Sequence, residues 1–488
     1  MPPGARDAIL TANSRQDRPT IPALGPISGF LSTLRARRRK KSTQPARRSR
    51  DSPPTSGACV WKARPKIYAR ARVADWTGRA QFRPDENPLP TDFVAWLRAG
   101  DLVRPNAVAC FDAYFSRFPS HQLAYCDEIC SDYAGWKPVL KPGWSPTLHL
   151  SQPYIGRAAF VRAALAGARQ DDMSADRVVD GLSPHEVGAL RLPLFEFPAA
   201  PAPTPAQFEA ICRDARPSVS IVIPTRDKAD LLEACLASLF ERTAYSNFDV
   251  VLVDNDSVEP RTLELIRDIE ATFDRLKVVK IPGEFNFSTL SNAGAQACDG
   301  EFLLFLNNDT QIVTPDWIER LLYFARDPKV GAVGAKLLYP DRKTQHVGVL
   351  LGMGGVAGHF GAGLDEKAPG WWGRNLAPHE VSAVTAACMM VERKKFDAAG
   401  RFDEVNLPVD LNDVDLCLRL GERGWRTICH SQVVLIHHQS ASRGGGLRLQ
   451  QVYARERRFF LERWRAVIRD DPYFHPGLSL YATTEMLP

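Results

Sequence analysis

The chain has 488 residues, of which 44% are hydrophobic and 24% are charged, a composition typical of a globular protein with two or three domains. Its formal net charge of +6 includes nine basic residues between Arg35 and Arg50, and about −3 remains without them. We therefore do not expect the folded part of the chain to be a basic body that grips nucleic acid.

The cysteines and the apolar runs exclude further classes of protein. Ten cysteines occur without a CxxC pair, so we expect reduced thiols in the core and no structural zinc site. No run of about 18 apolar residues is present, which argues against a transmembrane helix. The N-terminus lacks the order of charge and apolar residues of a signal peptide, so the sequence favours a cytoplasmic protein.

Composition divides the chain into segments. Residues 1–60 are rich in proline, serine and arginine, which predicts a disordered basic tail. Its run RARRRKK suits peripheral contact with the inner face of the cell membrane, and a plain solvated tail is the alternative. Residues 90–198 form a compact segment, and the proline-rich residues 199–216 are typical of a linker. A main domain at 217–465 and a C-terminal extension at 466–488 follow.

Short apolar strands alternate with helical segments in the main domain. This alternation predicts an α/β fold with a mostly parallel sheet flanked by helices. The pattern that begins at Asp309, with an acid, a short spacer, a proline, a helix and a strand, also begins at Asp101. The earlier copy has no counterpart of the upstream runs SIVIPT and VVLVDNDS. We therefore expect it to be half a domain without a nucleotide-binding half.

Polar side chains follow the first two strands of the main domain. Pro224, Thr225 and Asp227 end the run SIVIPTRD, and Asp254 ends the run VVLVD. Ligands of α/β sheets bind beyond the carboxyl ends of the strands. Asp254 is suited to accept a hydrogen bond from a nucleobase or a ribose hydroxyl. Asp227 is equally suited to cap a helix that begins near Lys228.

Two motifs carry candidate metal ligands. Asn307, Asn308 and Asp309 end the run LLFLNND, and carboxylate and amide oxygens are ligands that hard divalent cations prefer. A loop of ordinary turn residues is the alternative. His437 ends the run VLIH, and a neutral imidazole can complete a metal shell, although a single histidine at a strand end is more often structural.

Asp413 and Asp415 lie at the start of a helix that the spacing in LNDVDLCLRL predicts. The helix dipole favours acids at this end, so at least one of the two is explained as a cap alone. The other explanation is a general base, which removes a proton from a substrate.

The residues Gly352 to Ala357 read GMGGVA and fit the GxGxxA pattern of dinucleotide sites. Such a site requires a helix next and an acid at a second strand end about 20 residues on. The stretch that follows is instead rich in glycine and proline. We therefore expect a loop over the active site rather than a nicotinamide-dependent oxidoreductase.

Taken in order, these motifs resemble the family 2 glycosyltransferases of the GT-A fold, above all their bacterial rhamnosyltransferase-like branch of polysaccharide biosynthesis. The resemblance covers roughly residues 217–465 and is carried by EFNFSTLSNAGA, LLFLNNDTQIVTPDWIERLL, VGAVGAKLLYPD, TQHVGVLLG, NDVDLCLRL, HHQSASRG and RFFLERW. In residues 90–198, LAYCDE, KPGWSPTLHLSQPYIG and LRLPLF are similar to the acceptor-side half of such a domain. The resemblance thus implies a truncated GT-A-like half domain before the catalytic GT-A domain.

The resemblance also implies a site, residue by residue. The positions that hold the nucleotide-diphospho-sugar match Pro224, Thr225, Asp227, Asp254, Asn307 and Asn308. Asp309 matches the ligand of Mg²⁺ or Mn²⁺, and His437 matches a histidine near the metal and the diphosphate. Asp413 matches the catalytic base.

The implied reaction is the inverting transfer of a sugar, with rhamnose as the family-level expectation, to a hydroxyl of a saccharide or lipid-linked acceptor. The truncated first half and the Asn-Asn-Asp motif keep an alternative open. In it, the chain is a non-catalytic subunit of a polysaccharide assembly complex that binds glycan or nucleotide-sugar.

Overall fold

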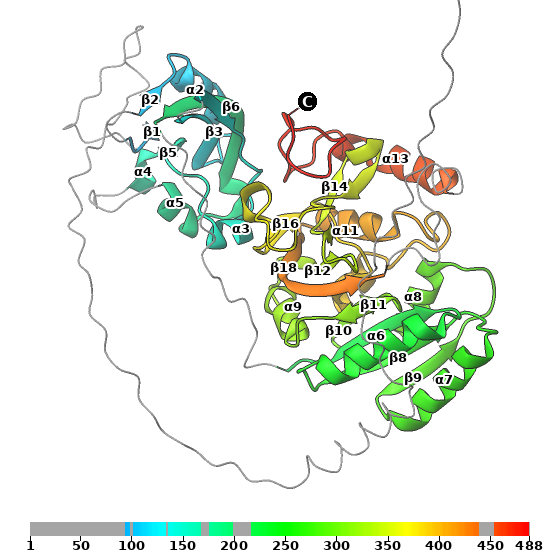
Figure 1. The fold of residues 1–488 in the computed structure, drawn as a ribbon. Helices are drawn as coiled ribbons and strands as arrows, with labels where there is room; N and C mark the ends of the chain where they lie inside the picture. Colours follow the sequence, from blue (N-terminus) through cyan, green and yellow to red (C-terminus); the bar gives the residue numbers. More distant parts are fainter. Residues whose placement is uncertain are drawn as a thin grey trace, which may run out of the picture. The chain divides into compact units, whose positions relative to one another are not determined.

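The computed structural model describes residues 93–97, 101–132, 135–166, 175–198, 216–438 and 453–487. The predicted basic tail lies outside these ranges, as do most of the predicted linker and the end of the HHQSASRG motif. Figure 1 follows the described elements through a first, smaller sheet and then a main sheet. No helix in the described ranges is long and apolar enough to cross a membrane.

The main sheet has ten strands. Eight follow the order β11-β18-β12-β17-β10-β7-β8-β9, while β13 pairs with β12 and β16 pairs with β18. The strands are β7 Val219–Thr225, β8 Phe248–Asp254, β9 Leu276–Lys280, β10 Phe302–Leu306, β11 Thr310–Ile312, β12 Val330–Leu338, β13 Thr344–His346, β16 His379–Val381, β17 Cys388–Glu392 and β18 Arg426–His437. Every residue of β7 and β10 is buried, as expected for apolar runs at the centre of a sheet.

One half of this sheet is parallel and the other is mixed. The strands β9, β8, β7 and β10 are parallel neighbours, which agrees with the predicted α/β alternation. Beyond β10, strand β17 runs antiparallel to both of its neighbours, whereas β12 and β18 are parallel to each other. The sheet is therefore mixed, and the predicted mostly parallel arrangement holds only for its first half. The parallel half supplies three adjacent carboxyl ends, at β8, β7 and β10.

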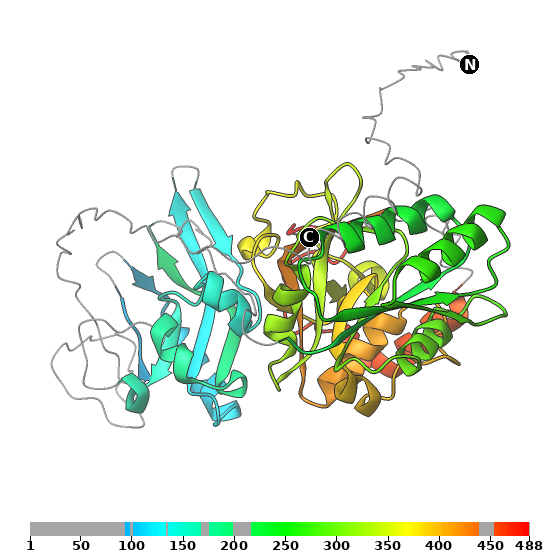
Figure 2. The same cartoon turned by 90° about the horizontal axis from the view of Figure 1, so that it is seen from below.

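Helices cover both faces of the parallel strands. Figure 2 shows α6 and α7 on one side and α8 on the other. The Asn286 side chain accepts a hydrogen bond of 2.9 Å from the backbone N–H of Thr289 and so caps α8. An added Cβ at Gly294 in α8 would lie 2.3 Å from a methyl carbon of Val222, so the glycine lets α8 lie against β7. The helices are α6 Ala229–Arg242, α7 Pro260–Thr272, α8 Phe287–Gln296, α9 Trp317–Ala325, α10 Arg393–Ala398, α11 Asn412–Glu422 and α13 Ala454–Ile468.

The first sheet repeats the strand arrangement of the mixed half of the main sheet. Its order is β1-β5-β3-β6-β2, and the corresponding strands of the main sheet are β10-β17-β12-β18-β11. Each pair of neighbours also has the same direction, including the parallel pairs β3–β6 and β12–β18. The first-sheet strands are β1 Phe93–Val94, β2 Leu102–Val103, β3 Leu123–Asp132, β4 Gly135–Val139, β5 Ala159–Arg162 and β6 Val187–Phe197, and its longest helix is α2 Ala107–Arg117.

The GMGGVA motif forms the turn of a hairpin. Strand β14, Val349–Leu351, pairs antiparallel with β15, Ala357–His359, and a three-residue 3₁₀ turn lies between them. Gly352 at the start of this turn has a φ of 81°, in the left-handed region that glycine favours. A dinucleotide site would require a helix here, so the hairpin contradicts that function for the motif.

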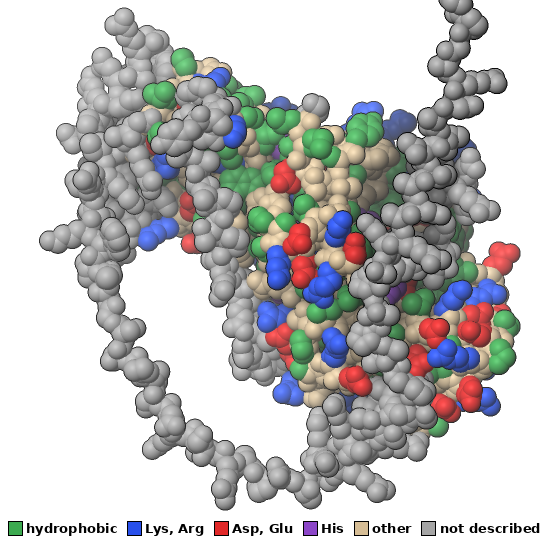
Figure 3. Space-filling model, viewed as in Figure 1, with side chains coloured by type: hydrophobic (Ala, Val, Ile, Leu, Met, Phe, Trp, Pro, Cys, Tyr) green, Lys and Arg blue, Asp and Glu red, His purple; other side chains and the backbone are tan. Residues whose placement is uncertain are grey.

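Charged side chains of both signs are interspersed on the face drawn in Figure 3 around α6 and α7. Arg261, for example, forms ion pairs with Asp230 and Glu233. A mixed surface of this kind differs from the single basic stripe that a nucleic-acid interface presents.

Candidate active site

The candidate site begins at the carboxyl ends of three parallel strands. The chain adds β8 and β9 on one side of β7 and then crosses to add β10 on the other side. Ligands of open α/β sheets bind at such a switch point between neighbouring strands. Thr225 ends β7 directly beside Asp254, which ends β8, and each is only 3% exposed. Pro224 remains within β7 opposite Val253. The predicted nucleotide residues on β7 and β8 therefore lie side by side.

The strand ends are joined by hydrogen bonds between side chains and loops. Asn308 donates through Nδ2 to Thr225 Oγ1 at 2.9 Å, which connects the loop after β10 to the end of β7. Asp254 Oδ1 accepts from the backbone N–H of Ser257 at 3.2 Å. Thr225, Asp254 and Asn308 thus form one continuous polar edge across three strands.

Asp227 has a different local role from a cap on the following helix. The helix α6 begins at Ala229, and Lys228 at its N-cap position makes no side-chain capping bond, so the helix-capping interpretation of Asp227 is wrong. The carboxylate instead accepts from the backbone N–H groups of Glu259 at 2.8 Å and Val258 at 2.7 Å. These bonds hold the pKa of Asp227 below its usual value. Asp227 therefore ties the loop after β7 to the loop after β8.

The loop after β10 meets the end of β18. Residue pairing places Thr310 in β11 opposite His437 in β18. Asp309 Oδ1 lies 3.1 Å from His437 Nε2, and Asn307 Nδ2 lies 3.3 Å from the same nitrogen. The predicted metal ligands Asp309 and His437 are therefore brought together.

A residue that the sequence analysis did not assign to the site, Gln345, fixes the orientation of His437. Gln345 is 1% exposed, and its Nε2 donates to the backbone carbonyl of His437 at 3.2 Å. Its Oε1 lies 2.6 Å from His437 Nδ1 and can only accept, so Nδ1 carries the proton in the neutral ring. The lone pair of His437 Nε2 then points toward Asp309. The motif TQHVG was the only signal of this role, and it gives no indication of the partner.

Asp413 and Asp415, at the start of α11, differ in their contacts. Asp415 is fully buried, and its carboxylate receives Arg419 Nε at 2.7 Å and Trp464 Nε1 at 2.9 Å. Both carboxylate oxygens of Asp415 therefore accept hydrogen bonds within the protein interior. Asp413 is half-buried, and its Oδ2 accepts from the backbone N–H of Ala386 at 3.0 Å. Asp413 therefore remains the candidate base.

A two-residue segment connects Asp413 with the Asn-Asn-Asp motif. Ala386 binds the Asp413 carboxylate, and the carbonyl of the next residue, Ala387, accepts from the N–H of Asn307 at 3.1 Å. Strand β17 begins at the following residue and pairs with β10, so this connection is part of the sheet. The candidate base and the candidate metal ligands are thus held from the same short stretch of backbone.

The residues at the ends of β10 and β18 fit a divalent cation that also binds its substrate. Within the described ranges, no group of three or more histidine, cysteine, aspartate or glutamate side chains is arranged to hold a metal. Asp309 Oδ1 is nonetheless buried without a hydrogen-bond donor, opposite the Nε2 lone pair of His437. A carboxylate oxygen and an imidazole lone pair that face each other are suited to bind the same cation. Phosphate oxygens and water would have to supply the rest.

Comparisons with known proteins identify a family for this part of the chain. Residues 220–396 match the family described as Glycosyl transferase family 2. The O-antigen biosynthesis protein RfbC of Myxococcus xanthus is 33% identical over 453 residues, which cover 80% of this chain and 34% of that protein. An uncharacterized protein, y4gI, of Sinorhizobium fredii is 31% identical over 441 residues, covering 80% of this chain and 48% of that protein.

A third relative matches a smaller share of the chain. The N-acetylglucosaminyl-diphospho-decaprenol L-rhamnosyltransferase of Mycobacterium tuberculosis is 26% identical over 254 residues, covering 46% of this chain and 77% of that protein. This chain spans about half the length of the Sinorhizobium relative and about a third of the Myxococcus relative. Residues 220–396, which contain β7, β8, β10 and the Asn-Asn-Asp motif, therefore form a domain that matches the family 2 glycosyltransferases.

Proposed function

We propose that the protein transfers a sugar, with inversion, from a nucleotide-diphospho-sugar to an acceptor hydroxyl in polysaccharide biosynthesis. The observation that carries this proposal is the connection of Asp413 and Asn307 through the Ala386–Ala387 backbone. It holds a half-buried carboxylate beside candidate ligands for a diphosphate-bound cation. A transferase needs this combination, because one group must remove a proton while another stabilises the departing charge.

On the donor side, the polar edge at β7 and β8 would bind the nucleotide. Asp254 has one carboxylate oxygen bonded to Ser257, and the other is suited to accept from a nucleobase or ribose hydroxyl. Thr225 and Asn308 would line the same edge nearer to the phosphates. Asp227 would act by holding the two loops together, because its Oδ1 already receives two backbone N–H groups.

Asp309 and His437 would hold Mg²⁺ or Mn²⁺ together with the diphosphate of the donor. When bound, the cation supplies positive charge that offsets the negative charge on the leaving diphosphate. Asn307 Nδ2 lies 3.3 Å from His437 Nε2 and would have to give up this contact when the cation binds that nitrogen.

On the acceptor side, Asp413 would remove the proton from the attacking hydroxyl. The acceptor oxygen forms a bond to the anomeric carbon of the sugar from the face opposite the diphosphate. The bond from that carbon to the diphosphate oxygen breaks, and the electron pair leaves with the nucleoside diphosphate. The proton remains on Asp413 until it passes to water. No covalent glycosyl-enzyme forms in this single displacement.

The names of two relatives support a narrower substrate proposal. One relative is an O-antigen biosynthesis protein and another is a rhamnosyltransferase that acts on a diphospho-decaprenol. Rhamnose is therefore the first donor sugar to test, with a saccharide or lipid-linked acceptor. Such acceptors would place the reaction in the cytoplasm at the inner face of the cell membrane.

A panel of nucleotide-sugars tests the proposed function. Incubation with Mn²⁺ and each donor, with water or a glycan mixture as acceptor, should release nucleoside diphosphate from one class of donor. Calorimetry on the same panel tests the alternative of a binding subunit. Donor binding without release on any acceptor would favour that alternative over the transferase.

We further propose that the first sheet is a half domain without a working site. Pairing of β2 with β6 places Leu102 opposite Glu196, so Glu196 has the sheet position that His437 has in β18. Asp101 precedes Leu102 as Asp309 precedes Thr310. Arg157 binds both carboxylate oxygens of Asp101, at 2.7 and 2.8 Å. The guanidinium thus neutralises the carboxylate that corresponds to a metal ligand, which supports one metal site per chain.

A further inference from the structure

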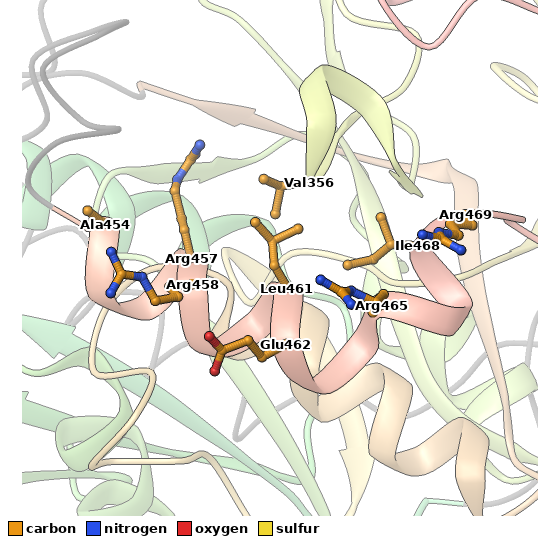
Figure 4. Close-up of a pocket in the computed structure, with 9 residues that line it drawn as sticks. All are labelled: Val356, Ala454, Arg457, Arg458, Leu461, Glu462, Arg465, Ile468 and Arg469. Atoms are coloured by element: carbon orange, nitrogen blue, oxygen red, sulfur yellow. The ribbon is translucent and has the colours of Figure 1, made fainter.

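A second concave surface lies on α13, beside the turn of the β14–β15 hairpin. It has a volume of about 670 Å³ and combines basic side chains with an apolar floor. Figure 4 shows Val356 of the hairpin facing Leu461 of α13, while Glu462 points away from Val356. The basic lining residues are Arg457, Arg458, Arg465 and Arg469, and the apolar ones are Val356, Ala454, Leu461 and Ile468. We call this surface the arginine groove.

The periodicity of α13 explains why these side chains share a face. Glu456, Phe460 and Trp464 recur every four residues and are buried against the domain. Arg457, Arg458 and Arg465 lie on the remaining face of the 15-residue helix, and Arg469 follows directly after its last residue. The groove therefore extends over several helical turns and is much larger than a single phosphate.

Among the described residues, most of the positive charge in the arginine groove has no acidic partner. Arg457 forms an ion pair of 3.0 Å with Asp410. Arg458, Arg465 and Arg469 are exposed, and none of them makes a hydrogen bond or ion pair with another residue of the described ranges. Glu462 is the single acid among the lining residues. A ligand that fits this groove must therefore be anionic.

We propose that the arginine groove is a docking surface for a membrane that contains anionic phospholipid. Phosphate headgroups complement the guanidinium groups of Arg458, Arg465 and Arg469, which have no partner among the described residues. The Val356–Leu461–Ile468 floor suits the glycerol and upper acyl carbons below them. A nucleic acid would match the charge but not the floor, because no aromatic side chain lines the groove for base stacking. The basic run at residues 35–41 plays no part in this inference.

The groove is connected to the candidate active site through the helix that forms it. The Glu456 carboxylate accepts from the backbone N–H groups of Val409 and Asp410, in the loop that leads to Asp413. Trp464 binds Asp415 of α11 from the same helix. If the proposed function holds, docking at α13 would place a membrane beside the helix that carries the base.

Binding to vesicles tests the docking surface in the full-length protein. Co-sedimentation is measured with vesicles of phosphatidylglycerol mixed with phosphatidylcholine, and with phosphatidylcholine alone. The test variant is Arg458→Gln/Arg465→Gln/Arg469→Gln. Each arginine near an anionic surface contributes about fivefold in affinity, so the triple variant should bind about 100-fold more weakly. The matched control removes three exposed charges elsewhere, through Arg267→Gln, Lys329→Gln and Arg423→Gln.

Three results would overturn the proposal. The first is a test variant that binds vesicles as tightly as the control variant. The second is loss of all binding when only the basic residues of 35–41 are replaced by glutamine. The third is a test variant that loses affinity for a single-stranded oligonucleotide but keeps its affinity for vesicles. Release of nucleoside diphosphate in solution should be equal in the test and control variants, so a failure of the docking proposal is distinct from a failure of the proposed function.

Discussion

Replacement of Gln345 by leucine tests whether His437 is a metal ligand. The substitution removes the acceptor 2.6 Å from His437 Nδ1 in a place where the glutamine is only 1% exposed. An unpaired buried donor costs about 1–3 kcal/mol. Loss of a group that orients a metal-bound histidine lowers metal affinity by about 10- to 100-fold, or about 1.4–2.8 kcal/mol. The first value is a loss of folding stability and the second a loss of binding free energy, so we expect Mn²⁺ affinity to fall by about 10- to 100-fold.

The assay for Gln345→Leu combines Mn²⁺ titration by electron paramagnetic resonance with NMR of ¹⁵N-labelled histidine without metal. Wild type should show His437 with its proton on Nδ1, and Gln345→Leu should lose this preference. Gln345→Glu keeps an acceptor for His437 Nδ1, although it removes the donor to the His437 carbonyl, and should restore the Nδ1 tautomer. Gln152→Leu replaces another buried glutamine, far along the chain, and serves as the control. Wild-type affinity and tautomer in Gln345→Leu would refute the assigned role.

Three further predictions test the separate roles of the site and its supports. Asp415→Ala should destabilise the protein by about 3–5 kcal/mol because it leaves Arg419 buried without its partner, and an unchanged melting temperature would contradict this. Mn²⁺ titration should give one site per chain and none in Asp309→Ala, whereas a second site retained in that variant would place a metal at Asp101. Gly294→Ala should cost about 1–3 kcal/mol by thermal unfolding, because its Cβ would lie 2.3 Å from Val222, and a stabilised variant would disprove the tight packing of α8.

The sequence predicted the parts of the site that depend on strand ends. Apolar runs that stop at a polar residue define where β7, β8 and β10 end, and parallel strands bring those ends to one edge. Thr225, Asp254 and Asn308 could therefore be grouped before the structure was known. The sequence indicated the repeated strand order of the first sheet only through the pattern that begins at both Asp101 and Asp309.

Choices that depend on distant partners could not be made from the sequence. Asp413 and Asp415 have the same local signal, and only the contact of Asp415 with Trp464, 49 residues later, separates them. Gln345 reaches His437 across 92 residues, with no spacing that would reveal the contact. Asp227 was assigned to a helix cap or to the nucleotide because its bonds to the loop after β8 also arise from tertiary structure.

The kinetic effect of Asp413→Asn tests the central claim most directly. Turnover of the donor that the panel identifies is compared with wild type, with donor affinity and melting temperature measured on the same samples. We expect kcat to fall about 10²- to 10⁴-fold, the contribution of a general base, while donor affinity and stability stay unchanged. Full turnover by Asp413→Asn would contradict the assignment of Asp413 as the base and the inverting mechanism built on it.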